Sequence, residues 1–146
     1  MDRIAGELFP DLASSHRNGP DRKLLLEIAR AADRVIDAIE GLAWAWSQHS
    51  IVRLGEIVSV LRDLARACAH ALSAIEAPAA LHTRLRLCLE REREARSLTR
   101  DARAWLLVDQ TDPHMAIRGD ALACHVEVAA AACARLRAHL ERRTLA

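Results

Sequence analysis

The chain has 146 residues, with 21 Lys and Arg against 20 Asp and Glu, so its formal net charge is +1. That length suits one domain with a substantial core. The small net charge argues against a polybasic membrane anchor or a DNA-coating protein, because both need a strong positive excess. About half of the residues are apolar, which excludes a wholly disordered chain.

The composition indicates helices. Ala and Leu are strong helix formers and supply most of the apolar residues, whereas only five Gly and four Pro interrupt the chain. The alternating β-branched and aromatic runs that are typical of strands are absent from the sequence. We therefore expect an all-α fold.

The sequence contains no signal for export or membrane insertion. Its first residues, MDRIAGELFPDL, are charged and lack the apolar core of a signal peptide. No apolar run approaches the roughly 20 residues that cross a bilayer. The cysteines follow no disulfide framework, so we expect a cytoplasmic protein with reduced thiols and no membrane partner.

Residues 1–20 read as a flexible or loosely docked leader. They contain Phe9-Pro10 and a turn-rich run from Ser14 to Pro20, and we expect Leu8 and Phe9 to contact the body. Asp21 is the predicted N-cap of the first helix. Apolar residues then recur at steps of three and four, which places them on one helix face. They are Leu25, Ile28, Ala32, Val35, Ile39, Leu42 and Trp46.

Three more helices follow with the same rhythm. Residues 47–50 break the first pattern, and Ser50 is the predicted cap of a second helix. That helix ends at Glu76-Ala77-Pro78, and Pro78 is suited to the first turn of the following helix. A third segment covers about residues 79–109, and Asp112 caps a fourth helix with Pro113 in its first turn. The predicted core positions are Ile51, Leu54, Val58, Leu61, Ala65, Cys68, Leu72 and Ile75; Leu81, Leu85, Cys88, Ala95, Leu98, Ala102, Trp105 and Leu106; and Met115, Gly119, Leu122, Val126, Ala129, Cys133, Leu136 and Leu140.

These segments have matched predicted lengths, each about 26–31 residues or roughly 40–45 Å. Short connections between them require neighbours to run antiparallel. We therefore predict one domain over residues 21–146, an antiparallel up-down-up-down four-helix bundle with a short irregular N-terminal leader.

Glu92 falls where the heptad of the third helix requires a core residue. A buried carboxylate costs several kcal/mol unless it is paired. We favour a local rotation of the helix that keeps Glu92 in solvent beside arginine. The alternative is a polar layer that fixes register or lines a cavity.

Metal and cofactor motifs are absent from the sequence. It contains no Glu-x-x-His pair for a di-iron site, no Cys-x-x-Cys and no Gly-rich phosphate loop. Cys68, Cys88 and Cys133 are interpreted as small core residues. We predict no metal and no cofactor, although ligands assembled from different helices would escape this test.

Two short segments resemble helical families. The run Ala69–Ala74 is similar to the segment around the phospho-accepting His of histidine phosphotransfer domains, with His70 on the outer face. Ser73-Ala74 stands where those domains have Lys-Gly. The run Arg118–His125 resembles the Arg-x4–6-His signature of HEPN ribonucleases. That resemblance implies phosphate binding by Arg118 and acid–base chemistry by His125.

The ends of helices one and three are predicted to meet at one end of the bundle. All three tryptophans would gather there, and Trp commonly anchors binding surfaces. Trp44 lies two residues from Trp46, so the two cannot share the inward face, and we expect Trp44 to be exposed. The candidate ligand- or partner-binding residues are Trp44, Trp46, His49, Trp105, His114 and Arg118.

The favoured function is a non-enzymatic interaction or accessory module whose partner is another protein or a second copy. Small residues from Ala129 to Ala134 would let another helix approach closely. One alternative is a HEPN-like ribonuclease or toxin that uses Arg118 and His125. Another is a small-ligand binder at the Trp-rich end. Nucleic acid is a further partner class, although the net charge does not indicate it.

Overall fold

The computed structural model describes residues 20–49, 51, 54–108 and 112–145. Four helices account for most of them: α2 (Pro20–His49), α3 (Gly55–Ser73), α4 (Pro78–Val108) and α5 (Pro113–Leu145). No strand occurs among the described residues, which confirms the all-α prediction. The predicted leader lies outside the described residues except for Pro20.

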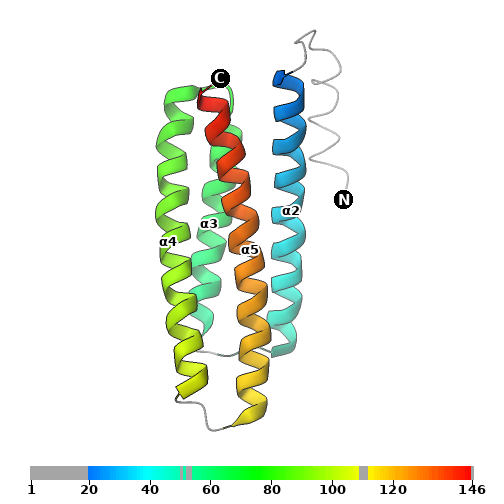
Figure 1. The fold of residues 1–146 in the computed structure, drawn as a ribbon, viewed down its shortest axis with the longest axis vertical. Helices are drawn as coiled ribbons and strands as arrows, with labels where there is room; N and C mark the ends of the chain where they lie inside the picture. The colour runs from blue at the N-terminus through cyan, green and yellow to red at the C-terminus, as the bar shows by residue number, and fades with distance from the viewer. Residues whose placement is uncertain (1–19, 50, 52–53, 109–111, 146) are drawn as a thin grey trace.

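Consecutive helices run in opposite directions (Figure 1). Ion pairs follow the same order: at one end of α2 and α5, Arg143 lies 3.2 Å from Asp21, and six residues further along α2, Glu27 lies 2.7 Å from Arg142. Toward the other end of this pair, Gly41 faces His125. The residue numbers rise along α2 as they fall along α5, as antiparallel packing requires.

The four helices do not close into a symmetric square. α5 is the central element, because it packs extensively on α2 and α4 and also touches α3. α3 packs on α4, whereas its backbone hardly approaches that of α2. Among the described residues, the side of the bundle between α2 and α3 is therefore open.

Two predicted helix starts are confirmed. Pro78 begins α4, and Pro113 begins α5. Both prolines occupy a first helical position, where no backbone N–H donor is needed. The Asp112 carboxylate accepts a hydrogen bond of 2.9 Å from the backbone N–H of His114, which is the predicted cap.

Three predicted boundaries are wrong. Asp21 is not a cap but lies in the first turn of α2, where its carboxylate pairs with Arg143. α2 also continues to His49, three residues into the expected break. α3 has only 19 residues, well below the matched length, and it begins at Gly55 without a side-chain cap. The predicted cap Ser50 lies outside the described residues.

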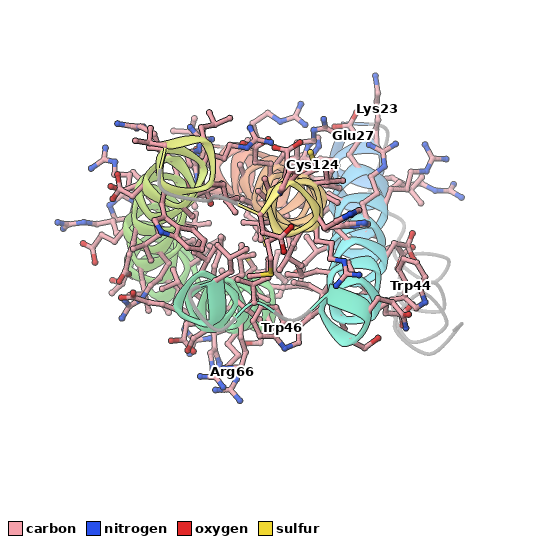
Figure 2. All side chains as sticks on the ribbon, turned by 90° about the horizontal axis from the view of Figure 1, so that it is seen from below. Lys23, Glu27, Trp44, Trp46, Arg66 and Cys124 are labelled. Atoms are coloured by element: carbon pink, nitrogen blue, oxygen red, sulfur yellow. The ribbon has the colours of Figure 1, made fainter. Side chains whose placement is uncertain are left out.

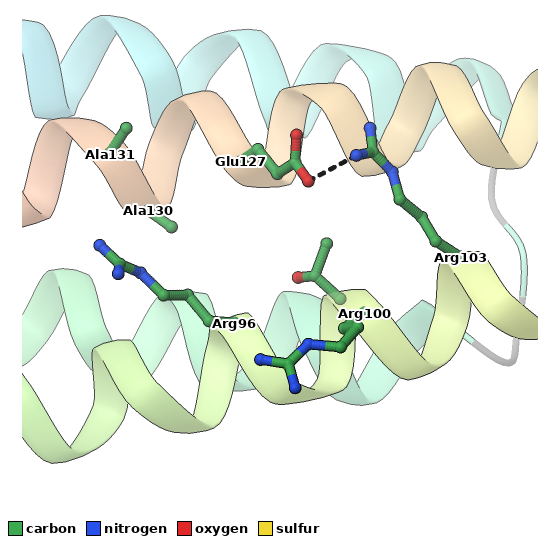
Figure 3. Close-up of a pocket in the computed structure, with 7 residues that line it drawn as sticks. Arg96, Arg100, Arg103, Glu127, Ala130 and Ala131 are labelled. Carbon is green, nitrogen blue, oxygen red and sulfur yellow. Dashed lines mark hydrogen bonds and ion pairs between the residues drawn. The ribbon is translucent and has the colours of Figure 1, made fainter.

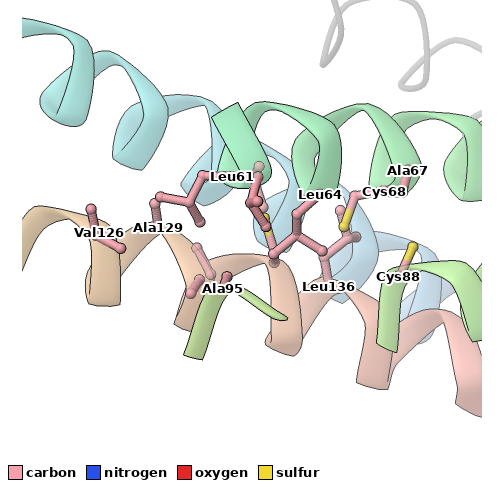
Figure 4. Packing of buried hydrophobic residues seen from close by; sticks show 14 of the residues in the cluster. Leu61, Leu64, Ala67, Cys68, Cys88, Ala95, Val126, Ala129 and Leu136 are labelled. Atoms are coloured by element: carbon pink, nitrogen blue, oxygen red, sulfur yellow. The ribbon is translucent and has the colours of Figure 1, made fainter. Parts of the chain in front are cut away.

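The core forms where the inner faces of all four helices meet (Figure 4). Most of the predicted core residues are buried there, including Ile28, Leu61, Leu122 and Leu140. α3 buries a wider face than predicted, because it contacts both α4 and α5. The additional buried residues of α3 are Ile57, Val60, Leu64, Ala67 and Ala71.

Glu92 is buried, so the favoured expectation of a solvent-exposed carboxylate is wrong. The residue is 3% exposed. Its carboxylate accepts hydrogen bonds from Arg137 Nε of α5 at 2.9 Å and from Arg96 Nη2 at 2.7 Å. The helix keeps its inward rotation because α5 supplies a cation opposite Glu92, so the chain forms the polar layer.

Candidate functional site

The open side of the bundle is an apolar groove with a volume of about 420 Å³. α2 and α3 supply its walls, and no other described helix lines it. Its lining residues are Ile39, Leu42, Ala43 and Trp46 of α2, and Val58, Leu61, Arg62, Ala65, Arg66 and Ala69 of α3. We call this feature the α2–α3 groove. Clefts between bundle helices are common binding sites.

The groove has a basic edge on α3. Arg62 and Arg66 lie 3.5 and 3.9 Å from the same Asp63 carboxylate oxygen, and both arginines are largely exposed. Exposed pairs at such distances contribute little to stability. Both guanidinium groups can therefore exchange Asp63 for another anion at little cost.

The three tryptophans have different environments. Trp46 packs against the core, lines the groove and contacts the position of Gly55. Trp44 is 63% exposed, as expected, and lies on a different side of α2 from Trp46 (Figure 2). Trp105 packs against the core from α4 but does not line the groove. Of the three tryptophans, Trp46 is therefore the one that lines the groove.

The proposed catalytic pair is not joined by the fold. Arg118 is exposed, whereas His125 is half-buried and faces Gly41 of α2. A spacing of seven residues separates their backbones by about 10.5 Å along α5. His114 is exposed, and the side chain of His49 lies outside the described residues.

His70 is exposed near the end of α3, as its outer position predicted. Its backbone carbonyl accepts a hydrogen bond from the Ser73 hydroxyl at 2.8 Å. Arg84 of α4 also donates to that carbonyl and to Ser73 Oγ. These contacts tie the end of α3 to α4 and involve the backbone of His70 rather than its ring.

Three thiols meet in the core, which the sequence spacing did not predict. Cys68 of α3 hydrogen bonds to the thiols of Cys133 of α5 and Cys88 of α4, and Figure 4 shows Cys68 and Cys88 facing each other. These bonds and burial raise the pKa of the Cys68 thiol far above its ordinary value. Cys68 therefore stays protonated at neutral pH and is a poor nucleophile.

The part of the chain that the structure describes holds no group of three or more His, Cys, Asp or Glu arranged for a metal ion. Cys124 is the exposed cysteine, and its sulfur accepts a hydrogen bond of 3.4 Å from Arg103. Among the same residues, no helix has both the length and the hydrophobicity to traverse a bilayer.

Sequence reasoning identified Trp46 but missed the groove. Apolar periodicity places Val58, Leu61 and Ala65 on one face but does not reveal which neighbour covers it. The sequence signal that could have indicated the groove is the pair Arg62 and Arg66, which borders that apolar face. Comparison with protein-family models, with curated proteins and with solved structures finds no match.

Proposed function

We propose that this protein is a non-enzymatic helical interaction module that assembles with a second copy of itself through the α2–α3 groove. The open apolar side of the bundle carries this proposal. A four-helix bundle normally buries each neighbouring pair of helices. Here α2 and α3 leave Ile39, Trp46 and Val58 partly exposed along a groove. Apolar surface of this kind favours association.

Charges on the two sides of the groove support a second copy as the occupant. Arg62 and Arg66 border the groove on α3. On α2, Glu40 is exposed, lies one helical turn before the groove residue Ala43, and forms no ion pair among the described residues. A two-fold arrangement that sets α2 of one copy beside α3 of the other brings these opposite charges together twice.

The available area suits a reversible dimer. The 19 residues of α3 are about 28 Å long, and two packed helices are roughly 20 Å wide. Such a face offers roughly 560 Å² per copy, so a dimer buries roughly 1,100 Å², just below the range of stable interfaces and within that of weak, reversible ones. We expect a dissociation constant of about micromolar order.

Sedimentation equilibrium on the full chain tests the proposal. Ala69→Glu places a charge in the groove and should shift the protein toward monomer. Ala104→Glu is the matched control, because Ala104 is also exposed and lies four residues before the end of its helix. Circular dichroism should show equal helicity in both variants. A monomeric wild type at about 100 μM, two orders above the expected constant, would refute the proposal, as would equal effects of the two variants.

The proposal includes a cytoplasmic location. Its support is that Cys68, Cys88, Cys124 and Cys133 are all free thiols, although Cys68 contacts two others. Oxidising compartments favour the pairing of such neighbours.

A further inference from the structure

Arginines gather around α5, on the side of the bundle formed by α4, α5 and α2. A hollow of about 450 Å³ between α4 and α5 is lined by Arg96, Arg100 and Arg103 (Figure 3). Two hollows of about 240 and 370 Å³ lie between α2 and α5, and both are lined by Arg34 and Arg135. Arg30 lines the smaller one. We call this surface the α5 face.

The hollows form one continuous surface. Ala131 lines both the α4–α5 hollow and the larger α2–α5 hollow, so it joins the two sides across α5. Arg34, Ala132 and Arg135 are shared by the two α2–α5 hollows. The α5 face therefore spans three helices, and its arginines lie on both sides of α5.

This face is basic although the chain has a net charge of only +1. Six arginines line the three hollows, against the carboxylates of Glu27, Asp37 and Glu127. Glu127 already pairs with Arg103 at 2.7 Å, and Glu27 pairs with Arg142 at 2.7 Å. Positive charge is thus concentrated on one side of the molecule.

Four of the six arginines have no ion-pair partner within the described part of the chain. They are Arg30, Arg34, Arg100 and Arg135. Their guanidinium groups are held by no carboxylate and can turn toward an incoming anion. They come from α2, α4 and α5, so a ligand that meets all of them must cross the whole face.

The middle of the α5 face carries small apolar side chains. Val128 is 59% exposed on α5, and the neighbouring exposed residue of the hollows is Ala131. Small side chains let a second helix approach closely. Because arginines flank this strip, the complementary shape is a helix with one apolar edge and carboxylates beside it.

We infer that the α5 face binds an acidic amphipathic helix of another protein. Its apolar edge packs on Val128 and Ala131, and its carboxylates meet Arg100 on one side and Arg34 and Arg135 on the other. Nucleic acid fits less well, because no Phe, Tyr or Trp lines the three hollows to stack a base. Phosphates would also leave the exposed Val128 without an apolar partner. The face lies apart from the α2–α3 groove, so this inference does not depend on self-association.

Fluorescence anisotropy with a labelled synthetic peptide tests the inference. The probe is a helix of about 20 residues, roughly 30 Å long, with Leu and Ala along one edge and Glu on both flanks. The full chain should bind it, and raised salt should weaken binding. The double variant Arg100→Glu with Arg135→Glu should bind about tenfold or more weakly.

The matched control is Arg86→Glu with Arg93→Glu, because it makes the same charge change at exposed positions outside the face. This control should change affinity by less than about twofold. Val128→Ser should also weaken binding although it leaves the net charge unchanged, which separates docking on α5 from simple charge attraction. Equal losses in the two double variants would overturn the inference. So would tighter binding of a single-stranded RNA or a DNA duplex than of the peptide, or no peptide binding at all.

Discussion

Removing Arg137 should destabilise the protein more than removing Glu92, although the two form one ion pair. Glu92 is 3% exposed, so a variant that takes away Arg137 leaves a buried carboxylate with Arg96 alone. Arg137 is less deeply buried, and without Glu92 it keeps Glu141 at 2.6 Å. Breaking a fully buried pair costs about 3–5 kcal/mol. We therefore expect a loss of about 3–5 kcal/mol for Arg137→Met and about 2–3 kcal/mol for Glu92→Leu.

The double variant Glu92→Leu with Arg137→Met should recover most of this loss. It leaves neither charge unpaired, and apolar replacements of similar volume are often neutral. Guanidinium denaturation followed by circular dichroism measures all four free energies of unfolding and gives the coupling energy. Arg137 has a pKa raised by its hydrogen bonds to Glu92 and Glu141, against the opposing effect of burial, so it stays charged throughout. A loss below about 1 kcal/mol for Arg137→Met would refute this account of the polar layer, because that is the range of exposed pairs.

Three further predictions concern packing and ionisation. Leu122→Ala should cost about 2–5 kcal/mol by chemical denaturation, whereas Leu107→Ala should cost under about 0.5 kcal/mol, because the first side chain is buried and the second exposed. Gly119→Ala should cost about 1 kcal/mol, because its Cβ would lie 2.4 Å from Leu106 Cδ2. In a Leu106→Ala background the same change should become stabilising through helix propensity, and an unchanged sign would contradict the close contact. Above pH 9 the unfolded Cys68 thiol ionises while the folded one, whose pKa is raised, keeps its proton. Stability should thus fall more steeply with pH in the wild type than in Cys68→Ala, and parallel pH curves would exclude this.

Local sequence signals predicted the elements better than their contacts. The starts at Pro78 and Pro113 follow from the chemistry of those residues, since proline suits a first helical turn. The number of helices and most of the core follow from apolar periodicity. The late start of α3 was missed because Ile51 and Leu54 are buried in a turn, so they fit the apolar pattern without extending the helix.

The candidate surfaces depend on how the helices pack against each other, which periodicity does not encode. The α2–α3 groove exists because α3 packs against α5 rather than against α2. Nothing in the sequence of α3 alone specifies which of the two helices it contacts. Glu92 was misplaced for the same reason, since its partner Arg137 lies 45 residues away. Net charge was a poor guide as well, because it averages the arginines of the α5 face with carboxylates elsewhere on the surface.

The weak packing between α2 and α3 has a consequence for how the molecule opens. α2 is attached to the rest of the bundle chiefly through α5, whereas α3, α4 and α5 all contact one another. Sub-global fluctuations should therefore release α2 while the other three helices hold together. Its backbone amides would then exchange with deuterium sooner than those of α4.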